Sequence, residues 1–109
     1  MANHFAAELI HEGLPAISLT SDISVITSTA NDFSYKEIFA RQIIALGKEK
    51  DVVIGLSTSG KSKNILYAYK WAKRTGLEVI DFPRKKGLDT PRTQEYQLRL
   101  LHQVWEYLK

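Results

Sequence analysis

Cysteine is absent from the 109 residues of this chain. Disulfide bridges and thiol chemistry are therefore excluded, and the absence fits a cytoplasmic protein. No uninterrupted apolar run approaches the ~20 residues that a membrane span needs. Residues 1–9 lack a basic segment followed by an apolar core, so we do not expect a secretory signal. Internal repeats and low-complexity segments are missing too, which leaves a chain of ordinary globular character.

The composition supports that interpretation, with 44% hydrophobic and 25% charged residues. The length suits one domain over residues 1–109 rather than two. The net charge is +3, and the positive residues gather in 60–63, 70–74 and 83–87. A basic cluster can attract nucleic acid or a small anion. Neither an aromatic-interleaved RNA motif nor zinc-finger spacing accompanies it, so we interpret it as a solvated face and disfavour nucleic acid.

Predicted strands alternate with predicted helices along the chain. We expect helices over residues 3–12, 34–47, 62–76 and 90–109, a short helix with a turn within 21–32, buried strands over 15–20, 51–57 and 77–82, and a loop over 83–89. This alternation predicts an α/β fold with a parallel sheet flanked by helices in three layers. Three strands make a thin sheet, so we expect an exposed edge and another subunit that completes the structure.

Cap residues mark several of these helix ends. Ser34 and Glu37 have the spacing of a capping box at the start of the second long helix, and Gly47 suits a left-handed residue after its end. Thr90 is the expected cap of the last helix, with Pro91 in its first turn.

The segment "GLSTSGKS", residues 55–62, follows an expected strand and precedes an expected helix. The amino end of a helix offers unpaired N–H groups and a partial positive charge, so phosphate binds there readily. The loop carries four hydroxyl residues around Gly60, which are Ser57, Thr58, Ser59 and Ser62. It also satisfies the nucleotide-binding P-loop expression literally, although only Asp81 offers a weak candidate for a magnesium-binding Asp. A Ser-rich cap and turn is the structural alternative.

Three further groups carry chemistry. His4 and Glu8 lie four residues apart and share one helix face, where they could exchange a proton, bind a metal or form a surface pair. Gln94 and His102 lie two turns apart beside the apolar stripe of the last helix, where a buried polar group needs a partner. Asn31 and Asp32, before an aromatic residue, favour a turn or hydrogen bonds to sugar hydroxyls.

Together these groups resemble the phosphoheptose isomerases, a branch of the SIS (sugar isomerase) domain proteins with a flavodoxin-like fold. The matching segments cover most of the chain in the family's order and are "HFAAEL" (4–9), "PAISLTSDISVITSTANDF" (15–33), "FARQIIALGKEKDVVIGLSTSGKSKNIL" (39–66) and "DTPRTQE" with the later His102 (89–102).

The resemblance implies an aldose–ketose isomerisation of sedoheptulose 7-phosphate to D-glycero-D-manno-heptose 7-phosphate, for lipopolysaccharide synthesis. It implies that Glu8 is the base that moves a proton between C1 and C2 through an enediol, with His102 as its acid/base partner. It also implies a homotetramer with shared active sites.

The resemblance implies three sets of binding residues. The hydroxyl groups that would bind phosphate are Ser57, Thr58, Ser59 and Ser62. The residues that would contact the sugar are Asn31, Asp32, Thr90 and Gln94. The implied zinc ligands, one site per subunit, are His4, Glu8, Gln94 and His102, a set of imidazole, carboxylate and amide donors that suits this cation.

The chain departs from the family in length. We expect that an amino-terminal helix, a first strand with an Asn-Gly-Gly-Ser loop, and a later strand before "DTPR" are missing, which makes the sheet incomplete. Lys61 stands where the family carries a small polar residue. Two alternatives therefore accompany the isomerase: a non-catalytic SIS module that binds a sugar phosphate or a partner protein as a regulator, and the P-loop nucleotide enzyme.

Overall fold

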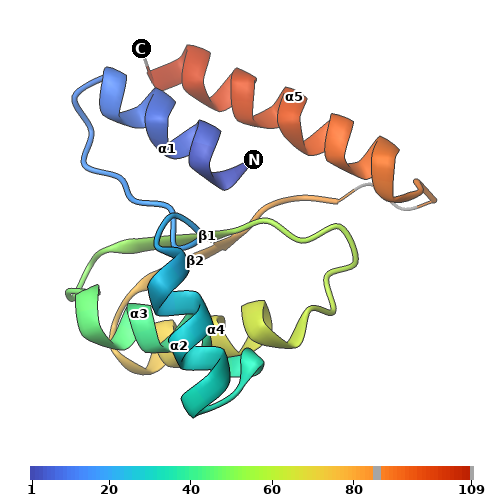
Figure 1. Ribbon diagram of the computed structural model, residues 1–109. Coiled ribbons are helices and arrows are strands. Elements are labelled where there is room, and N and C mark those ends of the chain that lie inside the picture. Colours follow the sequence, from blue (N-terminus) through green and yellow to red (C-terminus); the bar gives the residue numbers. More distant parts are fainter. Residues whose placement is uncertain (85–86, 109) are drawn as a thin grey trace.

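The computed structural model describes residues 1–84 and 87–108. Helices lie on both sides of a small central sheet (Figure 1). In chain order the elements are α1 (Ala2–His11), α2 (Ile23–Asp32), the 3₁₀ helix η1 (Tyr35–Glu37), α3 (Ala40–Leu46), β1 (Val52–Gly55), α4 (Lys63–Arg74), β2 (Glu78–Asp81) and α5 (Thr90–Leu108). The predicted α/β class with a parallel sheet between helices is confirmed.

The sheet consists of β1 and β2, which pair in parallel with Val53 opposite Val79. α4 makes the crossover between them, as parallel strands require. The predicted helix over 62–76 is confirmed, and it ends before Gly76, whose φ of +84° suits a residue without a side chain. This unit places the loop 56–62 at the carboxyl end of β1.

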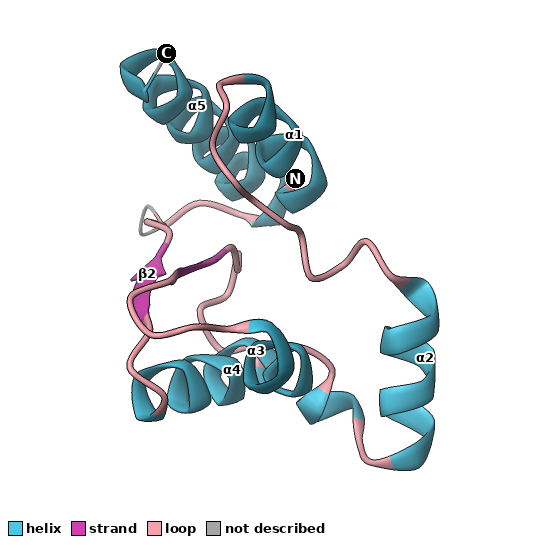
Figure 2. Cartoon of the chain, turned by 90° about the vertical axis from the view of Figure 1, so that its left-hand side faces the viewer, coloured by secondary structure: helices cyan, strands magenta, loops and turns pink. Residues whose placement is uncertain are grey.

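Two apolar clusters hold the helices to opposite faces of the sheet. On one face, Ile43 of α3 packs with Ala68 and Ala72 of α4. On the other face, Phe5 of α1 and Leu101 of α5 pack together with Phe82. Figure 2 shows the consequence: α1 and α5 lie side by side on one side of the sheet, and α3 and α4 lie on the other.

The strand predicted over 15–20 is wrong. This segment has no regular structure among the described residues, and Ile17 is 65% exposed. Its hydroxyl groups bond to other side chains: the Ser18 and Thr20 side-chain oxygens lie 2.8 Å apart, and Thr20 donates to Asn3 of α1. The buried character predicted for 51–57 is also wrong at Val52, which is half-exposed because the two-stranded sheet leaves part of its surface open.

The single helix predicted over 34–47 is wrong in its first half, where η1 precedes α3. The Ser34 hydroxyl donates to the Glu37 carboxylate at 3.4 Å rather than capping a backbone amide, so the capping box does not form. Gly47 has a φ of −70° and is not left-handed. A side chain at Gly47 would instead press on the Ile43 carbonyl and Leu77.

The long final helix is confirmed, but its cap is not Thr90. Asp89 precedes the helix and its Oδ1 accepts a hydrogen bond from the Arg92 amide at 3.0 Å, because a carboxylate is a stronger acceptor for a helix amino end. Part of the loop predicted over 83–89 lies outside the described residues. None of the helices described is long and apolar enough to cross a membrane.

Candidate functional site

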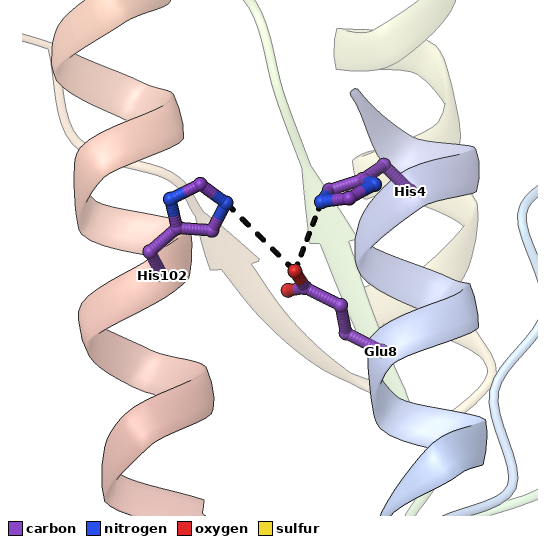
Figure 3. A group of neighbouring side chains, drawn as sticks. All are labelled: His4, Glu8 and His102. Atoms are coloured by element: carbon purple, nitrogen blue, oxygen red, sulfur yellow. Dashed lines mark ion pairs between the residues drawn. The ribbon is translucent and has the colours of Figure 1, made fainter.

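Two helices bring three ionisable side chains together on one side of the sheet (Figure 3). The predicted face of α1 holds His4 and Glu8, and their Nε2 and Oε1 atoms lie 2.9 Å apart. His102 approaches from α5, with its Nε2 at 3.8 Å from the same Glu8 oxygen. The two imidazole rings meet edge to face with centroids 5.9 Å apart. The carboxylate therefore lies between two imidazoles.

The Glu8 carboxylate is the most enclosed member of this group. Its side chain is 17% exposed, against 58% for His4 and 50% for His102. Its second oxygen, Oε2, is buried and has no hydrogen-bond partner among the described residues. A buried carboxylate oxygen without a donor is costly, so this atom is available to a substrate proton or a cation.

A cation fits these donor atoms by chemistry and by distance. One ligand atom from each of His4, Glu8 and His102 lies within 4.8 Å of the others. Two imidazole nitrogens and a carboxylate oxygen are the donor types that zinc takes in catalytic sites. Gln94 is exposed on α5, two turns before His102.

The hydroxyl-rich loop forms the second part of the site. Three of its hydroxyl oxygens converge: Ser57 Oγ lies 3.2 Å from Ser62 Oγ and 3.5 Å from Ser59 Oγ. Ser57 is buried, and its hydroxyl also accepts from the Gly60 amide at 3.0 Å. Ser59 accepts from the Lys61 amide at the same distance. The amides and hydroxyls of the loop thus bond to one another. A bound oxyanion could accept hydrogen bonds from the same donors.

The amino end of α4 begins directly after this loop. Ser62 is the N-cap residue, and no side chain caps the first turn in the described part of the chain. A shallow pocket of about 520 Å³ lies there, lined by Tyr35, Lys36, Ser62, Lys63 and Asn64. Free amides, the positive end of the helix and two lysines make this an anion-attracting surface.

A polar network borders the loop on its other side. The Tyr69 hydroxyl donates to Asp81 Oδ1 at 2.9 Å, and Arg84 donates to both Asp81 oxygens at 3.1 and 2.9 Å. The hydrogen bond from Arg84 lowers the pKa of Asp81, while burial raises the pKa of Tyr69. Because this carboxylate is already engaged, Asp81 is a poor magnesium ligand, which argues against the P-loop alternative.

One side chain of α5, the helix that carries His102, is hydrogen-bonded to the hydroxyl-rich loop. Gln97 of α5 is 1% exposed, and its Nε2 donates to the Ser57 carbonyl at 3.1 Å and to the Pro83 carbonyl at 3.4 Å. Sequence reasoning missed Gln97, although it lies one helical turn before Leu101 on the buried face of α5. It missed Arg84 as well, because the basic cluster around it was interpreted as a solvated face.

The remaining predicted residues are spread over the surface. Thr90 and Gln94 are exposed near the start of α5. Asn31 and Asp32 are exposed in the last turn of α2, not in a turn between helices as expected. Figure 2 shows α2 well apart from the α1 and α5 pair. Within one chain, therefore, Asn31 and Asp32 do not join the His–Glu–His cluster.

The chain matches a known protein family over most of its length. The sequence profile of the SIS domain matches residues 3–82, most of the chain. The chain therefore belongs to the SIS domain family.

Within that family its similarity is to phosphoheptose isomerases. The protein of that name from Thermodesulfovibrio yellowstonii is 43% identical over 129 residues, which cover 99% of this chain and 64% of the relative. One from Helicobacter pylori is 43% identical over 122 residues, covering 93% of this chain and 64% of the relative. The first alignment is longer than this chain, so the relative carries residues inside the aligned region that have no counterpart here.

Solved structures of phosphoheptose isomerases are also similar to this chain. A phosphoheptose isomerase from Neisseria gonorrhoeae superimposes with a TM-score of 0.93 at 33% identity, over 98% of this chain and 68% of that one. One from Francisella tularensis gives 0.89 at 31% identity, over 98% and 67%. The chain spans about two thirds of the length of these relatives.

Proposed function

We propose that this chain acts in the aldose–ketose isomerisation of sedoheptulose 7-phosphate to D-glycero-D-manno-heptose 7-phosphate, a precursor for lipopolysaccharide, in the cytoplasm. The observation that carries the proposal is the Glu8 carboxylate held between His4 and His102, with an unpartnered buried oxygen. Similarity to phosphoheptose isomerases over nearly the whole chain supports the same conclusion.

In this proposal Glu8 is the base. Its carboxylate removes a proton from C1 of the open-chain ketose, which gives an enediol, and returns the proton to C2 to form the aldose. His102 moves the accompanying proton between the C1 and C2 oxygens. Both groups lie within reach of one small substrate segment, since their facing atoms are 3.8 Å apart.

The hydroxyl-rich loop holds the other end of the substrate. Ser57, Thr58, Ser59 and Ser62 bind the phosphate, helped by the amino end of α4. Thr90 and Gln94 contact the sugar from α5. Asn31 and Asp32 lie too far away to serve the same chain's cluster, so we propose that they contact sugar in a site shared between subunits of a homotetramer.

Zinc is the proposed cofactor, one ion per subunit. His4, Glu8 and His102 would hold it, with Gln94 as the fourth ligand, and the orphaned Glu8 oxygen fits such a role. When bound, the ion supplies a positive charge that polarises substrate oxygens.

Conversion of sedoheptulose 7-phosphate by the purified chain tests this proposal. We expect Glu8→Gln and His102→Ala each to lower turnover by about 10²- to 10⁴-fold, because each removes a proton-transfer group. His11→Ala, at the end of α1, and Glu12→Gln, at its C-cap, are matched controls, with exposed side chains outside the cluster. Unchanged turnover in either test variant would remove that residue from the mechanism.

The length comparison favours one second candidate, a SIS module that binds a sugar phosphate or a partner protein without turnover. The chain covers 64% of the first relative and lacks residues that the relative carries internally. This candidate predicts saturable binding of the sugar phosphate with no aldose product, and loss of that binding in Ser59→Ala but not in Glu8→Gln.

A further inference from the structure

Arg84 occupies an unusual place beside the hydroxyl-rich loop. It follows β2, yet its guanidinium reaches the loop after β1: Nη1 donates to the Ser57 carbonyl at 3.4 Å. A Cβ atom added to Gly60 would lie 2.7 Å from the Cζ and Nη2 atoms of Arg84 and 2.8 Å from Nε. The guanidinium therefore lies against the backbone of the loop, at the one position that carries no side chain.

Two donors of Arg84, on atoms that lie beside that loop, are not used in hydrogen bonds among the described residues. A guanidinium carries five N–H groups. Both groups on Nη1 and one on Nη2 are used, on Asp81 and on the Ser57 carbonyl. Nε–H and the second Nη2 hydrogen have no bonded partner among the described residues. These two groups belong to the edge that lies over Gly60.

The converging hydroxyls lie on the same short segment. Gly60 donates its amide to Ser57 Oγ, which in turn contacts Ser62 Oγ. An anion that takes the place of these contacts would lie next to Gly60 and thus next to the open edge of Arg84. Two parallel N–H groups on one edge of a guanidinium match the spacing of two oxygens of a phosphate.

We propose that Arg84 is a phosphate-binding residue of this site, which adds a fixed positive charge and a two-pronged donor to a loop that otherwise offers hydroxyls and amides. The inference rests on the proposed function for the identity of the ligand as a sugar phosphate. Asp81 accepts two hydrogen bonds from the guanidinium, so its charge competes with phosphate for Arg84, and Asp81 also accepts a hydrogen bond from Tyr69.

The competing explanation is that Arg84 only neutralises Asp81 and braces the loop. The two explanations differ in what Asp81→Asn does. If Arg84 is a structural partner of the carboxylate, loss of either charge disturbs the loop equally. If Arg84 binds phosphate, the asparagine variant keeps an acceptor for Tyr69 and removes the charge that competes with phosphate for the guanidinium.

Calorimetric titration of the purified chain with inorganic phosphate, at low and at high salt, separates them. We expect Arg84→Gln to weaken phosphate binding at least about tenfold and to reduce its salt dependence, Arg84→Lys to restore part of the affinity, and Asp81→Asn to match or exceed the unaltered chain. Arg92→Gln is the matched control, because Arg92 forms an exposed ion pair with Asp89 at the same three-residue spacing.

The inference is overturned if Arg84→Gln binds phosphate as well as the unaltered chain does, if Asp81→Asn weakens binding as much as Arg84→Gln, or if the unaltered chain does not bind phosphate. Turnover of sedoheptulose 7-phosphate is followed separately. Arg84-dependent phosphate binding without turnover contradicts the proposed isomerase and leaves the assignment of Arg84 intact. Turnover that is unchanged in Arg84→Gln supports the isomerase and contradicts the assignment of Arg84.

Discussion

The two halves of the candidate site are built in opposite ways. The hydroxyl-rich loop is one short stretch of chain between β1 and α4, and most of its hydrogen bonds join residues within five positions of each other. The His–Glu–His cluster is assembled from α1 and α5, at opposite ends of the described chain. The first half depends on local backbone geometry, and the second depends on the packing that keeps two distant helices together.

Removal of a core side chain from each face of the sheet tests this difference most strongly. Leu101→Ala and Ile43→Ala should each lower the free energy of unfolding by about 3 kcal/mol, since both side chains are buried. Urea denaturation measures this loss. Only Leu101→Ala should also weaken zinc binding, because Leu101 packs α5 against Phe5 of α1. Equal loss of zinc affinity in Ile43→Ala would show that the halves are not independent.

Zinc should stabilise the assembled half directly. At a free concentration of 100 times its Kd, a ligand that binds only the folded state adds about 2.7 kcal/mol. We expect zinc to raise the Tm of the unaltered chain and of His11→Ala, and to leave His102→Ala unchanged. His11 is the appropriate control because it is exposed at the end of α1. A zinc response that survives His102→Ala would contradict the proposed ligand set.

Gln97 of α5 is hydrogen-bonded to the loop, so its loss should lower the stability of the chain. Gln97→Leu removes the donor to the Ser57 and Pro83 carbonyls and should cost about 1–2 kcal/mol, with Arg84 still bonded to Ser57. Thermal unfolding measures the change. Gln103→Leu, on the exposed side of α5, should stay within about 0.5 kcal/mol of the unaltered chain. Equal losses of stability in Gln97→Leu and Gln103→Leu would show that the Gln97 hydrogen bonds do not stabilise the chain.

The smallest effect concerns the acid stability of the network beside the loop. The pKa of Asp81 is lowered in the folded chain, chiefly by the hydrogen bond from Arg84, from an unfolded value near 3.8. The ionised carboxylate therefore stabilises the fold above that value, and this contribution is lost as the pH falls through the folded pKa. The stability difference between the unaltered chain and Asp81→Asn, measured from neutral into acid pH, should shrink. A constant difference would contradict the role of the charge.

Sequence reasoning predicted that hydroxyl groups gather in the loop before α4, and there is a physical reason for this. A short loop between a strand and a helix confines its hydroxyl residues to a small volume, and the Ser57 and Ser62 hydroxyls do lie close together. The His4 and Glu8 pair followed from helical spacing alone. The approach of His102 depends on helix packing across the whole chain, so only resemblance to a family could indicate it.

The errors fall where side chains compete with regular structure. Residues 15–20 have the composition of a strand, but among the described residues they pair with no strand, and the Ser18 and Thr20 hydroxyl groups bond to other side chains. At the start of α5, Asp89 takes the cap that Thr90 could have taken. Arg84 and Gln97 were missed because each acts on a loop distant in sequence, which no periodicity records.

The contact between Tyr69 and Gly55 constrains how this sequence can vary. The Tyr69 hydroxyl and ring fill the space that a Cβ atom on Gly55 would need, while the hydroxyl is held by Asp81. Any side chain at position 55 must therefore displace the tyrosine and with it the partner of the carboxylate. Larger residues at position 55 should be inherited only together with smaller ones at position 69, so the two positions should drift through evolution as one unit.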